Sequence, residues 1–121
     1  MKYPPNLPEL QRSIALHALA GDAVTYELVH DFRQLTVHIE SPRKACAQAG
    51  VRIAIAVAHQ HDAYWNDEGP PMLTVDGVYV ATVYAEAPAD GHENFFHDLV
   101  SVLNLCGVRP RPSVVHAEAD A

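Results

Sequence analysis

Basic residues are scarce in this sequence. Its 121 residues contain 8 Lys and Arg against 15 Asp and Glu, which gives a formal net charge of −7, and the basic residues are scattered rather than clustered. Nucleic-acid binding takes much of its affinity from clustered Lys and Arg, so we expect no nucleic-acid partner. A protein that mimics DNA would carry its carboxylates in dense rows, and this sequence has none.

Long apolar runs and closely spaced cysteines are also missing. No stretch approaches the roughly 18 to 20 consecutive apolar residues of a membrane span. The first ten residues, MKYPPNLPEL, lack the apolar centre of a signal peptide. Cys46 and Cys106 lie far apart without CxxC spacing, which favours two buried reduced thiols but leaves a disulfide between them open. We therefore expect a cytoplasmic protein that makes no membrane contact.

The sequence has no familiar catalytic or phosphate-binding motif. Its glycines are dispersed, without a P-loop or GxGxxG, and no serine stands in a GxSxG elbow. The run HENFFH, residues 92–97, differs from the HExxH of zinc proteases because its two histidines are five residues apart, about 140° around a helix. We therefore favour a non-catalytic protein and expect no cofactor.

Histidine, in contrast, is abundant, with eight residues. His59 and His61 follow a predicted strand, where side chains two residues apart project from one face and can supply a pair of metal ligands. His92, Glu93 and His97 are the candidates for a third ligand. These residues support an alternative hypothesis, a small metal-dependent enzyme or metal-binding protein. Solvated loop or capping histidines are the simpler interpretation, so we predict no metal.

The apolar content of 49% indicates a folded globular domain, and the predicted strands and helices together indicate the α+β class. We expect one domain over residues 1–108, with a mainly antiparallel sheet of four or five strands, and a loosely ordered, proline-containing acidic tail over 109–121. Capping and terminating residues predict three helices, near 7–20, 42–49 and 91–106.

Two of these helices have marked boundaries. The serine–proline pair at 41–42 is a typical helix start, and Gly50 is expected to end the helix that it opens. Asp90 and Glu93 fit a capping box at the start of the last helix, and Gly107 stands where a left-handed C-cap is expected.

The strands are indicated by alternation. Residues 22–40 fit either a helical face or two strands near 23–30 and 34–40, and we favour the strands because LTVHI alternates apolar and polar residues. The run VRIAIAVA, residues 51–58, predicts an interior strand with β-branched residues on one face and small residues on the other.

The clearest element is a β-hairpin near residues 72–86. The Asp-Gly pair at 76–77 suits a two-residue type I′ turn, which places Leu73 opposite Val80. Neither face of this hairpin carries a charge, so both faces should be covered, one of them by the helix near 91–106.

The second hairpin face and the polar loop before it offer the best candidates for a binding surface. Trp, Tyr and Met dominate the buried centres of protein interfaces. In the alternative arrangement, the tryptophan folds over the core, and the helix near 42–49 or 7–20 covers the second face. The candidate interface residues are Tyr64, Trp65, Met72, Tyr79 and Val83.

These observations predict a small acidic non-catalytic binding protein of the inhibitor, anti-activator or chaperone type. We expect it to act by contact with another protein and to form a homodimer. A further alternative is a small-molecule binding domain with a pocket between the sheet and its helices.

Overall fold

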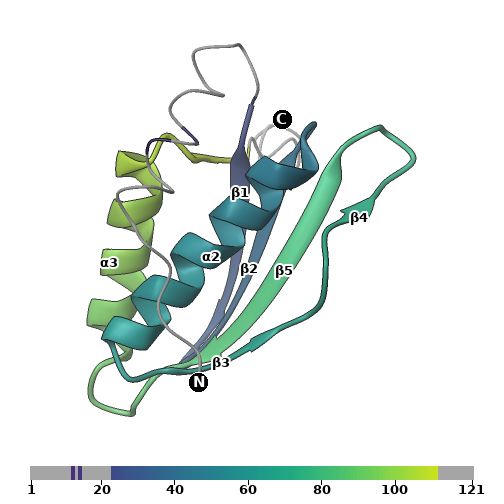
Figure 1. Ribbon diagram of the computed structural model, residues 1–121. Helices are drawn as coiled ribbons and strands as arrows, with labels where there is room; N and C mark the ends of the chain where they lie inside the picture. Colours follow the sequence, from purple (N-terminus) through teal and green to yellow (C-terminus); the bar gives the residue numbers. More distant parts are fainter. Residues whose placement is uncertain (1–11, 13, 15–22, 112–121) are drawn as a thin grey trace, which may run out of the picture.

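The computed structural model describes residues 12, 14 and 23–111 of the chain (Figure 1). Within them the chain forms a six-stranded sheet and two helices, so the expected α+β class is confirmed. The strand order is β3-β5-β2-β1-β6, and β4 pairs with β5 beside β3. The strands are β1 (Thr25–Asp31), β2 (Gln34–Ser41), β3 (Tyr64–Asp67), β4 (Met72–Leu73), β5 (Tyr79–Glu86) and β6 (Arg109–Pro110), and the helices are α2 (Lys44–Gln60) and α3 (His92–Leu105).

β1 and β2 form an antiparallel hairpin. Leu35, Val37 and Ile39 of β2 are buried, whereas His38 projects from the opposite face and is partly exposed. Alternation of this kind is what a sheet with one covered face and one open face requires. The interpretation of residues 22–40 as two strands rather than a helix is therefore confirmed.

The segment predicted as an interior strand, residues 51–58, is the second half of α2. All of its residues except Arg52 are buried, because α2 packs on β2 and β5, touches α3 along another side and is flanked by β3. A helix covered on several sides keeps no broad polar stripe, so its sequence loses the helical period. The strand prediction is wrong because periodicity alone does not separate a buried helix from a buried strand.

Gly50 lies inside α2 and does not end it, which corrects the predicted helix near 42–49. A Cβ atom on Gly50 would stand 2.6 Å from Cγ2 of Ile39, which is fully buried in β2. The glycine therefore allows the helix to approach the sheet closely. The predicted cap is also displaced: the N-cap is Arg43, whose backbone N–H donates to Ser41 Oγ at 3.2 Å.

Between β4 and β5, residues 75–77 form a three-residue loop that is closed by the pair Thr74 and Val78, in place of the expected two-residue turn. The Gly77 N–H donates to the Thr74 carbonyl at 3.1 Å, and the Thr74 N–H donates to the Val78 carbonyl at 2.8 Å. Gly77 has a φ of 83°, as expected for a left-handed bulge residue after a type I turn. Within this loop, Gly77 is therefore the one residue with a positive φ, a conformation that glycine adopts easily.

This loop shifts the strand register by one residue. Leu73 pairs with Tyr79 and Met72 with Val80, whereas the predicted turn pairs Leu73 with Val80. Because residues opposite each other project from the same face, Leu73 lies on the helix side of the sheet and Met72 on the open side.

α3 matches the helix predicted near 91–106. Its buried residues are Phe95, Leu99 and Leu103, and Gly107, with a φ of 89°, follows as the expected left-handed C-cap. The N-cap is Gly91 rather than Asp90, and no side-chain cap hydrogen bond forms, so the predicted capping box is wrong.

β6 pairs in parallel with β1, which makes the sheet mixed rather than wholly antiparallel. Arg109 and Pro110, placed in a loosely ordered tail by the sequence, therefore form part of the sheet, and residues 112–121 lie outside the described residues. Of the helix predicted near 7–20 the structure describes only Arg12 and Ile14; both are helical, and Ile14 is fully buried.

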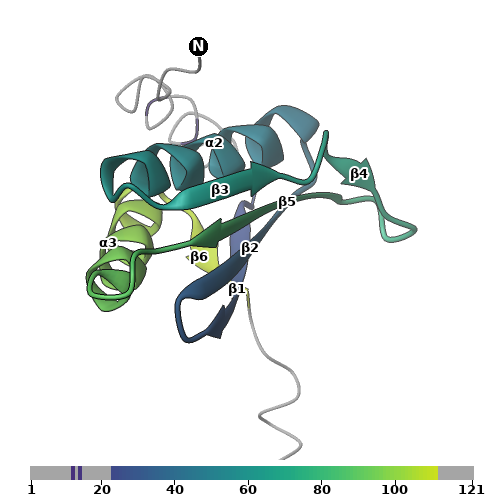
Figure 2. The same ribbon diagram turned by 90° about the horizontal axis from the view of Figure 1, so that it is seen from below.

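The helices α2 and α3 lie on one side of the sheet (Figure 2). The core between these layers includes Leu35, Val37 and Ile39 of β2 and Ala81 and Val83 of β5. On the other side of the sheet, the described part of the chain places no helix. Of the helices that the structure describes, none is long and apolar enough to cross a membrane.

Candidate functional site

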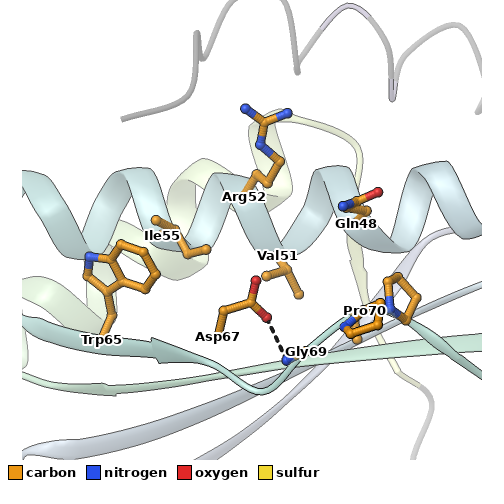
Figure 3. A pocket seen from close by; sticks show the side chains of 10 residues that line it. Gln48, Val51, Arg52, Ile55, Trp65, Asp67, Gly69 and Pro70 are labelled. Atoms are coloured by element: carbon orange, nitrogen blue, oxygen red, sulfur yellow. Dashed lines mark hydrogen bonds between the residues drawn. The ribbon is translucent and has the colours of Figure 1, made fainter. Parts of the chain in front are cut away.

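A cleft of about 470 Å³ lies between α2 and the segment that leads from β3 to β4 (Figure 3). Buried apolar side chains from α2 and β5 form its inner surface. Trp65 stands toward one end of the cleft and Pro70 toward the other. The lining residues are Gln48, Val51, Arg52, Ile55, Trp65, Asp67, Gly69, Pro70, Pro71 and Ala81.

Two of the lining residues, Arg52 and Asp67, are charged. Asp67 Oδ1 accepts a hydrogen bond from the backbone N–H of Gly69 at 3.0 Å, which orients the carboxylate. Figure 3 shows this carboxylate pointing toward α2, whereas the Arg52 guanidinium points away from it. The cleft therefore combines apolar surface, an indole ring and one inward-pointing carboxylate.

The five predicted interface residues lie in different environments. Val83 is 1% exposed beneath α2, and Tyr79 is partly buried against the same core. Trp65 is partly buried on that side of the sheet and lines the cleft. Tyr64 and Met72 are 63% and 71% exposed. The hairpin face that bears Val83 is thus covered by the chain's own helix, which is the alternative that the sequence left open.

The two exposed candidates do not form one patch. Tyr64 lies opposite Glu86 and Met72 opposite Val80, and these two partners are six residues apart, which corresponds to about 20 Å along β5. Near Met72 in the chain, the apolar side chains of Leu73 and Val75 are 60% and 103% exposed. We call these three side chains the hairpin tip: Met72, Leu73 and Val75.

Several residues of these surfaces could not be found from the sequence. A hairpin without charged side chains predicts two covered faces, but Leu73 and Val75 are exposed. For Asp67 the only signal is a glycine two residues later and then two prolines. That pattern predicts a turn stabilised by the aspartate side chain and says nothing about a ligand.

The histidines proposed as metal ligands do not share a face. His59 ends the last turn of α2 and His61 is its C-cap, and residues two apart on a helix are separated by about 200°. His61 Nε2 lies 2.9 Å from Oδ2 of Asp98, and its ring packs against that of Phe95 at a centroid distance of 5.6 Å. Among the described residues, no group of three His, Cys, Asp or Glu side chains is placed to hold a metal ion. His97 contacts the ring of its neighbour on α3 rather than either histidine.

His92 and Glu93 lie in the first turn of α3. His92 Nδ1 is 3.1 Å from the carbonyl oxygen of Ala89, and its ring is 4.9 Å from that of Phe32. The structure thus gives His92 and His61 separate partners, and it does not assemble the third ligand that the metal hypothesis requires.

The open side of the sheet carries charges that pair with one another. Arg33 donates to Glu86, the Tyr84 hydroxyl donates to Glu86 Oε1 at 3.1 Å, and Arg111 Nη1 lies 3.0 Å from Glu40 Oε2. The hydrogen bond from Arg33, followed by that from Tyr84, lowers the pKa of Glu86 below its ordinary value. Partial burial, followed by the bond to Glu86, raises the pKa of Tyr84.

Comparisons with known proteins found no match for this chain. The chain matches no protein-family model, no curated protein and no solved structure.

Proposed function

We propose that this chain is a non-catalytic binding protein that acts by contact with another protein, and that its first partner is a second copy of itself. The observation that carries the proposal is the exposure of the hairpin tip, at 71% for Met72, 60% for Leu73 and 103% for Val75. Met72 projects from the open side of the sheet and Leu73 from the helix side, and a partner that encloses this end of the hairpin would remove these apolar side chains from water, which lowers the free energy of the complex.

The backbone beside the hairpin tip supports the same proposal. β3 and β4 form one edge of the sheet, and no strand in the described part of the chain pairs with their outer side. An open edge can accept a strand from another chain, because its N–H and C=O groups point outward. A second copy would bring the same edge and the same apolar side chains to a two-fold interface.

Light scattering of the purified chain over a range of concentrations tests the homodimer. We expect the wild type to have the mass of a dimer and the Leu73→Glu, Val75→Glu double variant to have the mass of a monomer. Circular dichroism should show that the double variant is folded. Val29→Glu is the control, because Val29 is 55% exposed on β1, away from the tip, and this variant should remain dimeric.

A wild type that is monomeric at all concentrations contradicts the homodimer. The broader proposal is then tested by affinity purification with the wild type, the double variant and Val29→Glu as baits. A partner that binds the wild type and Val29→Glu but not the double variant supports binding through the tip. Equal recovery by all three baits contradicts it.

A further inference from the structure

We infer that the cleft between α2 and the β3–β4 segment binds a small organic cation, an amine or amidine attached to an apolar ring, with Asp67 as its counter-ion and Trp65 packed against the ring. This inference does not rest on the proposed function. The hairpin tip lies outside the lining of the cleft, so a partner at the tip and a ligand in the cleft use different side chains.

The size and the surface of the cleft fit a single-ring ligand. Its volume of about 470 Å³ lies in the range of small-molecule sites, which are mostly apolar and contain a few fixed polar groups. Val51 and Ile55 of α2 are buried and present an apolar surface, with Ala81 of β5 beside them. Such a surface favours the apolar part of a ligand by removing it from water.

The walls of the cleft are held in place before a ligand arrives. Trp65 packs against the hydrophobic core. Pro70 and Pro71 restrict the backbone that leads into β4, because a proline ring fixes φ. The bond between Asp67 and the Gly69 N–H orients the carboxylate. A site prepared in this way loses little conformational entropy when it binds.

Of the two charged side chains that line the cleft, the one that points inward favours a cation. The Asp67 carboxylate points inward, and the bond from Gly69 occupies only part of its acceptor capacity. Arg52 and Asp67 are both exposed, and the Arg52 guanidinium points away from Asp67 rather than toward it. The face of an indole ring attracts cations, and the net charge of −7 acts in the same direction.

Neutral and anionic ligands fit this surface less well. A neutral ring without a donor would remove water from Asp67 and return no hydrogen bond, which costs free energy. An anion would be repelled by the same carboxylate. The Gln48 side chain lies on the lining as well and can accept a further hydrogen bond from an amine or amidine.

Trp65 makes the test direct, because it is the single tryptophan of the chain. We would titrate the full chain with benzamidine, with its neutral isostere benzamide and with benzoate, and record tryptophan fluorescence and calorimetric heat. Benzamidine should give a saturable change in both signals. Benzamide should bind about tenfold more weakly or worse, because a hydrogen bond to a charged group contributes about that factor. Benzoate should not saturate.

Asp67→Asn removes the charge while keeping an oxygen that accepts from the Gly69 N–H. It should weaken benzamidine binding about tenfold or more and leave benzamide binding unchanged. Glu68→Gln is the matched control, since Glu68 is the neighbouring exposed carboxylate but does not line the cleft. Its affinity for benzamidine should equal that of the wild type.

Three results would overturn the inference: no saturation with benzamidine, equal affinities for benzamidine and benzamide, or undiminished benzamidine binding by Asp67→Asn. The Leu73→Glu, Val75→Glu variant separates this inference from the proposed function. It should bind benzamidine as the wild type does, whether or not the wild type is a dimer.

Discussion

Glu86 links β5 to the β1–β2 turn on the open sheet face. It accepts from Arg33, which lies in the β1–β2 turn, and from Tyr84 two residues earlier on β5. These bonds stabilise the carboxylate form, and the Arg33 bond is the largest reason that the pKa of Glu86 lies below its ordinary value of 4.5. A carboxyl group whose pKa is lower in the folded chain than in the unfolded chain ties stability to pH.

The sign of this effect gives a prediction. The contribution of Glu86 to stability is fully present above the unfolded pKa, near 4.5, and is lost as the pH falls through the lower folded value. Glu86→Gln should therefore be less stable than the wild type at neutral pH, and this difference should shrink as the pH falls below about 4.5. Urea unfolding at a series of pH values measures it.

Asp76→Asn is the control for this experiment, because Asp76 is an exposed carboxylate of the β4–β5 loop and asparagine also suits a turn. Its difference from the wild type should not follow the same course. A Glu86→Gln difference that stays constant from neutral to acid pH contradicts the role of the Arg33 bond.

For single residues, exposure to solvent could be predicted from the sequence only in part. Tyr64 and Met72 were proposed as surface residues and are exposed, whereas Val83, proposed with them, is buried. Val83 is buried because α2 packs on β5, whereas Leu73, on the same face of the sheet, is 60% exposed. Asp67 could not be predicted as a site residue, because its position beside α2 depends on α2 being a helix.

The position of α2 depends on a glycine. Gly50 faces Ile39 so closely that an added methyl group would stand 2.6 Å from Ile39 Cγ2. Ile39 is branched at Cβ and fully buried, so it has little room to move. The length of α2 and its approach to β2 are thus coupled at one contact.

Gly50→Ala should lower the free energy of unfolding by about 1 to 2 kcal/mol. Overpacking costs about 1 to 3 kcal/mol, and the better helix propensity of alanine returns up to about 1 kcal/mol of this. Gly91→Ala is the control: nothing lies within 4 Å of the added methyl group, so this variant loses only the preference of an N-cap for glycine over alanine and should lose less stability than Gly50→Ala. Urea denaturation of both variants compares them, and equal midpoints contradict the close contact.

Elements with one solvent-exposed face could be predicted from the sequence, and elements covered on several sides could not. LTVHI alternates because β2 has a covered face and an open face. Residues 51–58 do not show a helical period because α2 is enclosed. The hairpin was found, but an Asp-Gly pair fits a two-residue turn and a three-residue loop equally well, and only the hydrogen bonds of Thr74 separate them.

For the molecule as a whole, Val83 and Val29 show how the two sides of the sheet differ. Val83→Glu would bury a carboxylate beneath α2, where the side chain is 1% exposed. The expected cost is several kcal/mol, a large part of a typical stability of about 5 to 15 kcal/mol. Val29→Glu, at a position that is 55% exposed, should remain close to the wild type.

Thermal melting followed by circular dichroism distinguishes these variants. We expect Val83→Glu to be unfolded or to melt far below the wild type, and Val29→Glu to melt near it. A Val83→Glu protein with wild-type melting would show that the face under α2 is open to solvent, contrary to the arrangement in Figure 2.

The pairing of β6 with β1 sets the order in which the sheet can be completed during synthesis. β1 and β2 are adjacent in the chain and can pair as soon as both have left the ribosome. The outer side of β1 is covered only when Arg109 and the residues after it emerge, since Arg111 and its partner Glu27 are 84 positions apart. Until then β1 is an edge to which strands of neighbouring nascent chains can add. Of the strands that the structure describes, the last to be made thus protects the first from intermolecular pairing.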